Sequence, residues 1–328
     1  MSHAPRRTTR LIFCAALGAT LGPAFNAAAQ QYPARSVQMI VPYAAGGSID
    51  IMSRTVAAKL AEIWGRNVVI DNRPGASGMI GTEQVTRAEA DGYTLLGHTS
   101  SYTGTAAVRA KLPFDPARAI IPVGGIGKSA LILVVHPSLP VKTVREFVDL
   151  AKKNPGKLNY GSSGIGGNNH FAGALFDMAA GTKMTHIPYK GISLAMTAAA
   201  SGEVEVVIAS AAAVNPQLRA GRVRALGMSG AKASPLMPGI PSIAESGVPG
   251  YSYELWWGLF APAGMPAERL AFINASINKA LVSPELKKFL DNESAEAWIA
   301  TPQQLADLLP REIERYRKVA VAAGIPPQ

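Results

Sequence analysis

Two glycine- and serine-rich segments carry the residue types best suited to holding a ligand. Tyr43–Asp50 reads YAAGGSID and Tyr160–His170 reads YGSSGIGGNNH. Each follows an apolar run and precedes a helical pattern, so each is expected to join a strand to the start of a helix. The first backbone N–H groups of a helix have no partner within it and lie at its positive end. Such a loop can therefore bind a phosphate, a pyrophosphate or a carboxylate.

An ordinary turn with a helix cap is the alternative interpretation of each loop. In the first loop the cap would be Ser48 or Asp50, and in the second Ser162 or Asn168. The shared composition of the two loops favours ligand contact, because two similar anion-binding turns can hold one ligand from opposite sides.

Three segments of the sequence come close to familiar motifs, but none of them matches. The first loop lacks the spacing G-x-G-x-x-G of a dinucleotide site, and Ile165 stands where a nucleophile elbow around Ser163 needs glycine. Pro122–Ser129, PVGGIGKS, has the spacing of a P-loop, but proline has no N–H to offer a phosphate. We interpret GGIGKS as a flexible crossing between two lobes.

Catalytic and metal-binding groups are sparse. No spacing places a base against Ser162 or Ser163, and none matches a zinc or calcium motif. After residue 29 the chain has four histidines, His98, His136, His170 and His186. We expect a protein that is not an enzyme and that needs no metal or cofactor.

Alternating strands and helices position the two loops. The strands are predicted at 37–43, 67–71, 94–98, 131–136, 157–160, 184–188, 204–209, 223–228 and 255–261, and the helices at 48–64, from 78, and at 144–153, 171–180, 266–282, 284–291 and 302–323. This order is typical of mostly parallel sheets covered by helices. The pattern begins again after residue 130, which predicts two α/β lobes of similar size.

The lobes are expected to form a clamshell that the chain crosses twice. Lobe I comprises residues 30–128 and 252–328, and lobe II residues 129–251. Since ligands bind at the carboxyl ends of parallel strands, the site should lie in the cleft between the lobes.

The first 29 residues have the pattern of a cleaved signal peptide. MSHAPRRTTR holds three arginines and no acid, a 15-residue apolar run follows, and Ala27-Ala28-Ala29 provides a cleavage site. The run is too short to span a bilayer. The single cysteine, Cys14, lies in this leader, and bulky Phe13 argues against a lipoprotein box. We expect a periplasmic product without disulfides.

The formal net charge is +10, and it becomes +7 without the three leader arginines. The basic residues are scattered singly, which indicates a solvated surface that mildly favours anionic solutes and argues against nucleic acid as a partner.

Five segments in one order resemble the Bug-type extracytoplasmic receptors of the tripartite tricarboxylate transporter (TctC-like) family. They are VPYAAGGSID at 41–50, NRPGASG at 72–78, ADGYTLL at 90–96, YGSSG at 160–164 and HIPYKG at 186–191. AGRVRAL at 220–226, PSIAESGVPG at 241–250 and WGLFAPAG at 257–264 extend the resemblance over nearly the whole chain after the leader.

The resemblance implies a periplasmic-binding-protein type II fold, with a mixed, mostly parallel sheet in each lobe. It implies a monomeric solute receptor that holds a small carboxylate and presents it to the membrane subunits of a transporter, where one exists. The residues that it assigns to the ligand are Tyr43, Ala45, Gly46, Gly47, Ser48, Thr99, Ser100, Ser162, Ser163, Gly164, Asn168, His170 and Ser210.

Two departures from the family pattern bear on the ligand. Ala45 stands where the family commonly has proline, and SGEVE at 201–205 replaces Gly-Gly-Gln-Val-Asp. The following segment, 208–214, is small and apolar, so lobe II is expected to present little charge to the far end of a ligand. Asp50 is expected to brace the first loop, because a carboxylate would repel an acid.

Two alternatives to transport remain. The receptor could present its ligand to a signalling sensor, or the same fold could support a serine-dependent hydrolase. The first differs only in its partner, and the second lacks an evident base.

Overall fold

The computed structural model describes residues 1, 3, 4 and 32–328. The predicted signal peptide at 1–29, with Cys14, lies outside the described residues apart from 1, 3 and 4. The strands are β1 Val37–Val41, β2 Val68–Asn72, β3 Thr94–Thr99, β4 Ile120–Ala130, β5 Ile132–Val135, β6 Asn159–Ser162, β7 Thr185–Pro188, β8 Val206–Ala209, β9 Arg224–Met228, β10 Glu254–Pro262 and β11 Ala295–Ala297.

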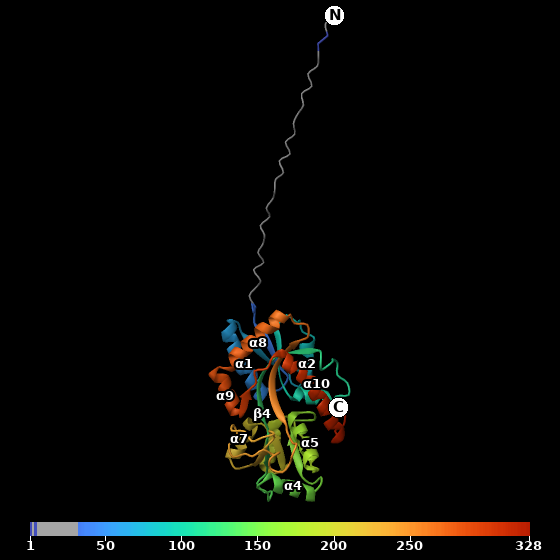
Figure 1. Ribbon diagram of the computed structural model, residues 1–328, viewed down its shortest axis with the longest axis vertical. Helices are drawn as coiled ribbons and strands as arrows, with labels where there is room; N and C mark the ends of the chain where they lie inside the picture. The colour runs from blue at the N-terminus through green and yellow to red at the C-terminus, as the bar shows by residue number, and fades with distance from the viewer. Residues whose placement is uncertain (2, 5–31) are drawn as a thin grey trace. The chain divides into compact units, whose positions relative to one another are not determined.

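The helices alternate with these strands (Figure 1). They are α1 Ser48–Trp64, the short 3-10 helix η1 Ala76–Gly78, α2 Met79–Thr86, α3 Ser101–Val108, α4 Val144–Lys153, α5 Asn168–Ala180, α6 Ile192–Ser201, α7 Ala211–Arg219, α8 Ala267–Leu281, α9 Pro284–Asn292 and α10 Pro302–Ala322.

A six-stranded sheet forms the first lobe, in the order β11-β4-β10-β3-β1-β2. The strands β1, β2 and β3 are parallel, whereas β10 runs antiparallel to both β3 and β4. Helix α1 packs against α8 and α9, and α10 packs against α3. The parallel strands therefore end together, and their following loops meet at one edge of the lobe.

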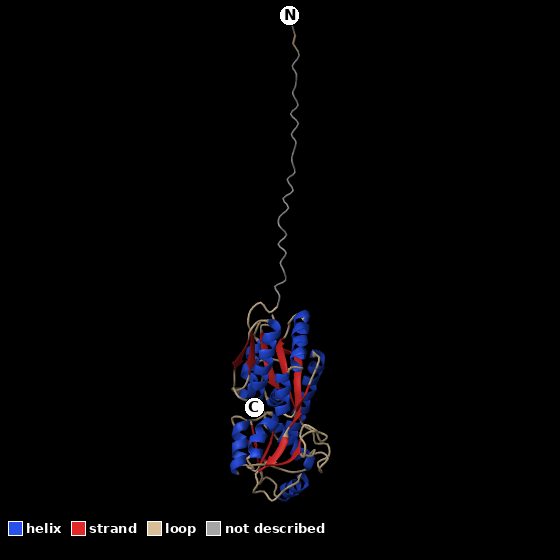
Figure 2. Cartoon of the chain, turned by 90° about the vertical axis from the view of Figure 1, so that its left-hand side faces the viewer, coloured by secondary structure: helices blue, strands red, loops and turns tan. Residues whose placement is uncertain are grey.

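A five-stranded sheet forms the second lobe, in the order β7-β6-β8-β5-β9, with β6, β7 and β8 parallel. The chain enters this sheet after β4 and leaves it before β10, and Figure 2 shows strands continuing from one lobe toward the other. This confirms the predicted two-lobed α/β fold. The exact lobe boundaries at 128 and 251 stay a prediction.

Local signals explain the predicted helices that the structure reproduces. Helix α4 starts at a capping box formed by Thr143 and Glu146, and α10 starts at one formed by Thr301 and Gln304, with Pro302 in its first turn. Helix α1 covers 48–64 as predicted and ends at Gly65, whose left-handed φ of 62° is a conformation that glycine adopts without steric cost. Helix α3 and strand β11 were missed, because neither has a clear apolar period.

The prediction of a flexible crossing at GGIGKS is wrong. These residues belong to β4, an 11-residue strand paired with β10 and β11. A Cβ on Gly125 would lie 2.7 Å from the carbonyl oxygen of Trp298, and one on Gly127 would lie 2.5 Å from the Leu290 side chain. The glycines therefore allow other segments to pack closely against the strand. Local sequence does not distinguish such a glycine-rich strand from a flexible linker.

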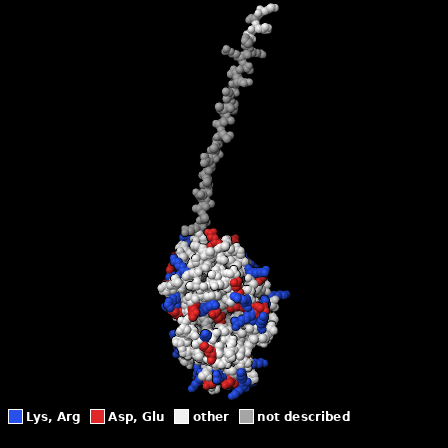
Figure 3. Space-filling view, viewed as in Figure 1, with Lys and Arg blue, Asp and Glu red and all other residues white. Residues whose placement is uncertain are grey.

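The surface shows mixed charge. Basic and acidic side chains are interspersed over the face drawn in Figure 3. Over the part of the chain that the structure describes, no helix is both long and apolar enough to cross a membrane.

Candidate functional site

The two glycine-rich loops have the same backbone conformation where they enter their helices. Gly46 has a φ of 88° and Gly166 a φ of 80°. The next residues are the helix N-caps, Gly47 with φ −78° and ψ 165° and Gly167 with φ −74° and ψ 168°. In each loop a residue with left-handed backbone angles is followed by an extended one, so that the backbone turns sharply into the helix. Only glycine adopts the left-handed angles of the first position without strain.

Neither helix is capped by a side chain. Within residues 32–328 no side-chain hydrogen bond caps α1 or α5, and the same holds for α2, α3, α6, α7 and α8, whereas α4, α9 and α10 are capped. The alternative interpretation, in which Ser48, Asp50, Ser162 or Asn168 caps a helix, is therefore wrong. The first N–H groups of α1 and α5 are left for another acceptor, and the helix dipole favours an anionic one.

Asp50 braces the first loop, as expected. Its carboxylate accepts hydrogen bonds from Gly46 N–H at 2.9 Å, Arg54 Nε at 3.1 Å and Asn72 Nδ2 at 2.9 Å. Burial alone would raise the pKa of Asp50, but these three hydrogen bonds outweigh it and lower that pKa. The negative charge of Asp50 is thus stabilised by hydrogen bonds from its own loop and its neighbours.

Two side chains, those of Ser163 and Asn169, tie the second loop to its own lobe. The Ser163 hydroxyl donates to Asn169 Oδ1 at 2.9 Å, and Asn169 Nδ2 donates to the carbonyl of Ile208 at 2.7 Å. Asn169 was missed as a site residue, since an asparagine in a helix start gives no sign of the strand that it will reach. Ser163 is thereby oriented within a rigid loop.

A histidine lies against Ser162, although no spacing in the sequence had placed one there. His186 Nε2 is 2.6 Å from Ser162 Oγ, which is also 3.1 Å from Gly164 N. Ser162 is fully buried, and burial lowers the pKa of His186 to about 4. Neither group has the exposure or basicity of a nucleophile and its base. The contact fixes the loop on β7.

The ring of His170 lies behind the second loop. It stacks on His186 with ring centroids 3.8 Å apart, and its Nδ1 accepts a hydrogen bond from Gly166 N–H at 3.1 Å. Burial, and next the neighbouring His186, lower the pKa of His170 to about 3. This geometry favours a role in shaping the loop over direct ligand contact.

Asn168 connects the two lobes. Its Oδ1 accepts hydrogen bonds from Ser100 Oγ and Tyr253 Oη, both at 2.9 Å, and its Nδ2 donates to Thr99 Oγ1 at 3.5 Å. Thr99 ends β3 and Ser100 follows it in the first lobe, whereas Asn168 opens α5 in the second. Three predicted site residues are therefore brought together, and Tyr253, which directly precedes β10, joins them.

Ser77 joins the two loops through the turn after β2. The Tyr43 hydroxyl donates to the Ser77 carbonyl at 3.2 Å, and Ser77 Oγ donates to the carbonyl of Ile165 at 3.4 Å. Ser77 has a φ of 54°, unusual for a residue with a side chain. The segment NRPGASG pointed to a turn, but only the fold shows that it touches both loops.

The two lobes also come into close backbone contact where Gly104 lies against Gly166. A Cβ on Gly104 of α3 would lie 2.6 Å from the carbonyl oxygen of Gly166 in the other lobe. Ala45 and Gly46, by contrast, are exposed, and Gly164, which has a φ of 128°, is half-buried. A Cβ on Gly164 would make only ordinary contacts, 3.7 Å from the Tyr189 carbonyl oxygen and 3.8 Å from Ser77 Oγ. The loops are thus held near each other, with parts of both still accessible.

Ser48 and Ser210 lie on either side of a buried carboxyl group. Ser48 Oγ accepts a hydrogen bond from Trp257 Nε1 at 3.0 Å. The hydroxyls of both serines act on Glu293, a residue from the end of α9 whose pKa is raised by burial. The expectation that the far end of the site carries little charge is therefore incomplete, because Glu293 comes from the first lobe.

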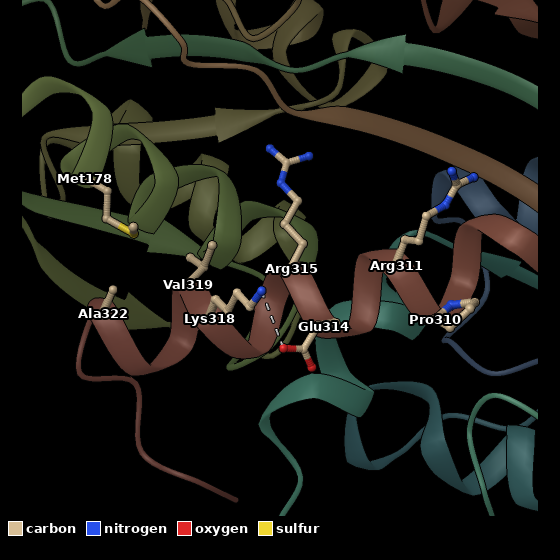
Figure 4. A pocket seen from close by; sticks show the side chains of 8 residues that line it. All are labelled: Met178, Pro310, Arg311, Glu314, Arg315, Lys318, Val319 and Ala322. Carbon is tan, nitrogen blue, oxygen red and sulfur yellow. Dashed lines mark ion pairs between the residues drawn. The ribbon is translucent and has the colours of Figure 1, made fainter.

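Three cavities lie beside α10, beside the C-terminal segment and beside β4, and the second of these borders the second loop at Ile165 and His170. One is a groove between α5 and α10, lined by Met178, Arg311, Arg315 and Lys318 among others (Figure 4), and one lies between α5 and the C-terminal segment, bordered by His170 and His186. The third lies beside β4 and β10. Among the described residues no group of three or more His, Cys, Asp or Glu is arranged to hold a metal ion.

A family model and a curated relative both place the chain in one family of receptors. A family model described as "Tripartite tricarboxylate transporter family receptor" matches residues 52–325. The chain is 34% identical over 308 residues to Protein BugT of Bordetella pertussis, covering 93% of this chain and 94% of that protein.

Solved structures agree with the sequence comparison. "R. palustris Rpa4515 with adipate" has a TM-score of 0.84 at 36% identity, covering 90% of this chain and 100% of its own. MatC from Rhodopseudomonas palustris with bound malate has a TM-score of 0.79 at 28% identity, covering 88% and 99% respectively.

Proposed function

The chain belongs to the tripartite tricarboxylate transporter receptor family, and on that premise we propose that it is a periplasmic receptor for a small carboxylate. The ligand is held between the two lobes and presented to the membrane subunits of a transporter. No chemistry is performed on it. Two neighbours in solved structures carry adipate and malate, which supports the ligand class.

One observation carries this proposal. Helices α1 and α5, one from each lobe, begin at glycine N-caps of matching conformation and have no side-chain cap. Their first N–H groups can hold the carboxylate from both sides without a positively charged side chain. Tyr43, Ala45, Gly46, Gly47 and Ser48 belong to the first side, and Ser162, Ser163, Gly164, Asn168 and His170 to the second, with His170 acting through the loop. Thr99, Ser100 and Ser210 complete the proposed site.

Closure of the lobes provides the mechanism. Asn168 bonds to Ser100 and Tyr253 across the lobe interface only when the lobes are together. A ligand that bridges the two loops binds the closed form better and shifts the equilibrium toward it. A partner that recognises the closed form then senses the ligand.

A thermal-shift screen tests the ligand class. Small mono- and dicarboxylates are compared with the amides and alcohols of the same carbon skeletons, and hits are measured by calorimetry. We expect one or more acids to raise the melting temperature while the matched amides do not. If another solute class stabilises the protein and no acid does, the carboxylate assignment is wrong.

Transport is distinguished from signalling by deleting the gene in the source organism. Loss of uptake of the identified acid supports a transporter as partner. Unchanged uptake with a lost transcriptional response to that acid supports a sensor instead.

The contact between His186 and Ser162 is the single feature that favours a hydrolase. Ester turnover by the purified protein that is abolished in Ser162→Ala and in Ser163→Ala would support that function. We expect no turnover, because Ser162 is fully buried and the pKa of His186 is lowered to about 4.

A further inference from the structure

A groove of about 770 Å³ lies where α10 passes α5 (Figure 4). Helix α10 packs against α3 and β4 of the first lobe and also against α5 of the second. Met178 is the α5 residue that lines the groove, and residues of α10 form the rest of it. The groove is therefore built from both lobes.

One face of α10 brings three basic side chains to this groove. Arg311, Arg315 and Lys318 follow each other at intervals of four and three residues, which places them on the same side of the helix. All three are exposed, whereas another face of α10, which includes Ile313 and Tyr316, is buried in the core. Figure 4 shows Arg311 and Arg315 extending from the helix in the same direction.

The positive charge of this face is weakly compensated within the protein. Over residues 32–328 neither Arg311 nor Arg315 forms a salt bridge. Arg311 Nε donates to the backbone carbonyl of Asp307 at 2.8 Å, and Arg315 Nη2 donates to that of Ser252 at 3.0 Å. Since a guanidinium group has five N–H donors, most of these donors have no acceptor among the described residues. Two such donors fit the two oxygens of a carboxylate.

The rest of the lining fits a protein segment. Glu314 is the only acid among the residues that line the groove, and Lys318 Nζ lies 3.8 Å from its carboxylate. Met178 is 46% exposed there, with Val319 and Ala322 of α10 beside it (Figure 4). Methionine adapts its shape to a partner, and an apolar patch with a charged rim is typical of protein interfaces. A lipid bilayer has a broad surface and does not enter a groove between two helices.

The groove is connected to the ligand site through α5. This helix carries Asn168 at its first position and Met178 ten residues later, about 15 Å along the same helix. Asn168 accepts a hydrogen bond from Ser100 of the first lobe. Arg315 donates to Ser252, which lies just before β10, where the chain returns to the first lobe. Movement of the second lobe therefore changes the width of the groove.

We propose that this groove is the docking surface for an acidic segment of the transporter's membrane subunits. The inference rests on the proposed function. Asp or Glu side chains of that segment pair with Arg311 and Arg315, and an apolar side chain packs on Met178. Because the groove takes its shape from both lobes, the segment fits it best in the closed arrangement and so recognises the receptor that holds a ligand.

Uptake by cells that carry charge-reversed receptors tests the inference on the full chain. The probe is the radiolabelled acid identified in the thermal-shift screen. Arg311→Glu with Arg315→Glu should lower uptake about tenfold or more, because attraction becomes repulsion, and should leave the affinity for the acid in calorimetry unchanged. Lys279→Glu with Lys288→Glu is the matched control, because these exposed lysines of α8 and α9 do not border the groove.

Two further measurements identify the partner and exclude a folding defect. Arg311→Glu with Lys318→Glu leaves the bond from Arg315 to Ser252 in place and should lower uptake in the same way, with the Tm of wild type. Benzoylphenylalanine in place of Met178 should photocrosslink to a membrane subunit more strongly when the acid is present. Mass spectrometry should map that crosslink to a segment rich in Asp and Glu. A crosslink to a segment without acids would overturn the inference.

The outcomes separate this inference from the proposed function. If uptake of the acid does not depend on this protein, the proposed transport function fails and the inference with it. If uptake depends on the protein but both charge-reversed pairs support it fully, the groove is not the docking surface and the proposed function stands. Loss of acid affinity in these variants would assign the arginines to lobe closure instead. Binding of wild type to phosphatidylglycerol vesicles that the variants lose would assign the groove to anionic lipid, and each of these two results overturns the inference.

Discussion

Gly47→Val tests the first loop most directly. Gly47 is the N-cap of α1 with φ −78° and ψ 165°, an extended conformation that valine adopts readily. A Cβ at this position would meet only the carbonyl oxygen of Ala44, at 3.9 Å, which is ordinary contact. The substitution therefore adds a branched side chain at the mouth of the helix without a clash inside the protein.

The expected magnitudes differ sharply for folding and binding. Valine is a poorer N-cap than glycine by about 1 kcal/mol, which lowers Tm by about 2–4 °C in a domain of this size. Binding should lose two hydrogen bonds to a charged group, each worth about 1.5–3 kcal/mol. The dissociation constant for the acid found in the screen should then rise about 100-fold or more.

Calorimetry and thermal unfolding measured on the same preparations separate the two effects. Ala58→Val is the matched control, because Ala58 is exposed on the same helix, well away from the loop. Unchanged affinity in Gly47→Val would remove the α1 N-terminus from the site. A loss of binding that accompanies a collapse of Tm would refute the premise that the position is free of internal contacts.

Three further predictions follow from contacts on the lobe interface and in the core. Burial lowers the pKa of His98 to about 4, and burial with His186 lowers that of His170 to about 3, against about 6.5 when unfolded. The unfolded chain thus binds protons first, so between about pH 6.5 and 4 stability falls by about 1.4 kcal/mol per pH unit for each, as urea unfolding would measure. Gly104→Ala should keep the lobes from closing, which lowers affinity about tenfold or more and enlarges the particle in X-ray scattering with ligand. Asn168→Ala should weaken ligand binding several-fold in calorimetry, by removing the acceptor of the two hydrogen bonds from Ser100 and Tyr253 across the lobe interface.

Each of these has a clear contrary result. Buried carboxyls with raised pKa, Glu293 and Glu312 among them, act in the opposite direction on acidification, so the test is the difference between wild type and His98→Gln. An identical pH slope in the two would contradict the histidine account. Wild-type affinity in Gly104→Ala or Asn168→Ala would show that binding does not require the closure described.

Much of the framework was predictable because it is encoded locally. The capping signals at Thr143 and Thr301 and the apolar alternation of β1 and β3 lie within a few residues of the elements that they define. The glycine pair at 46–47 likewise predicts a tight entry into α1. Strand β4 was not predicted. Its glycines make room for Trp298 and Leu290, which pack against the strand from positions far along the chain.

The sequence by itself determined two glycine-rich turns, each leading from a strand into a helix, and the order of elements that places them in different lobes. Only the tertiary structure decided that both helix starts are uncapped, that His186 binds Ser162, and that Glu293 reaches Ser48 and Ser210 from the end of α9. The physical reason is the different distance along the chain over which the two kinds of interaction act. Backbone preferences act over a few residues, whereas the partner of a buried polar group is set by how strands β4 and β10 bring distant segments together.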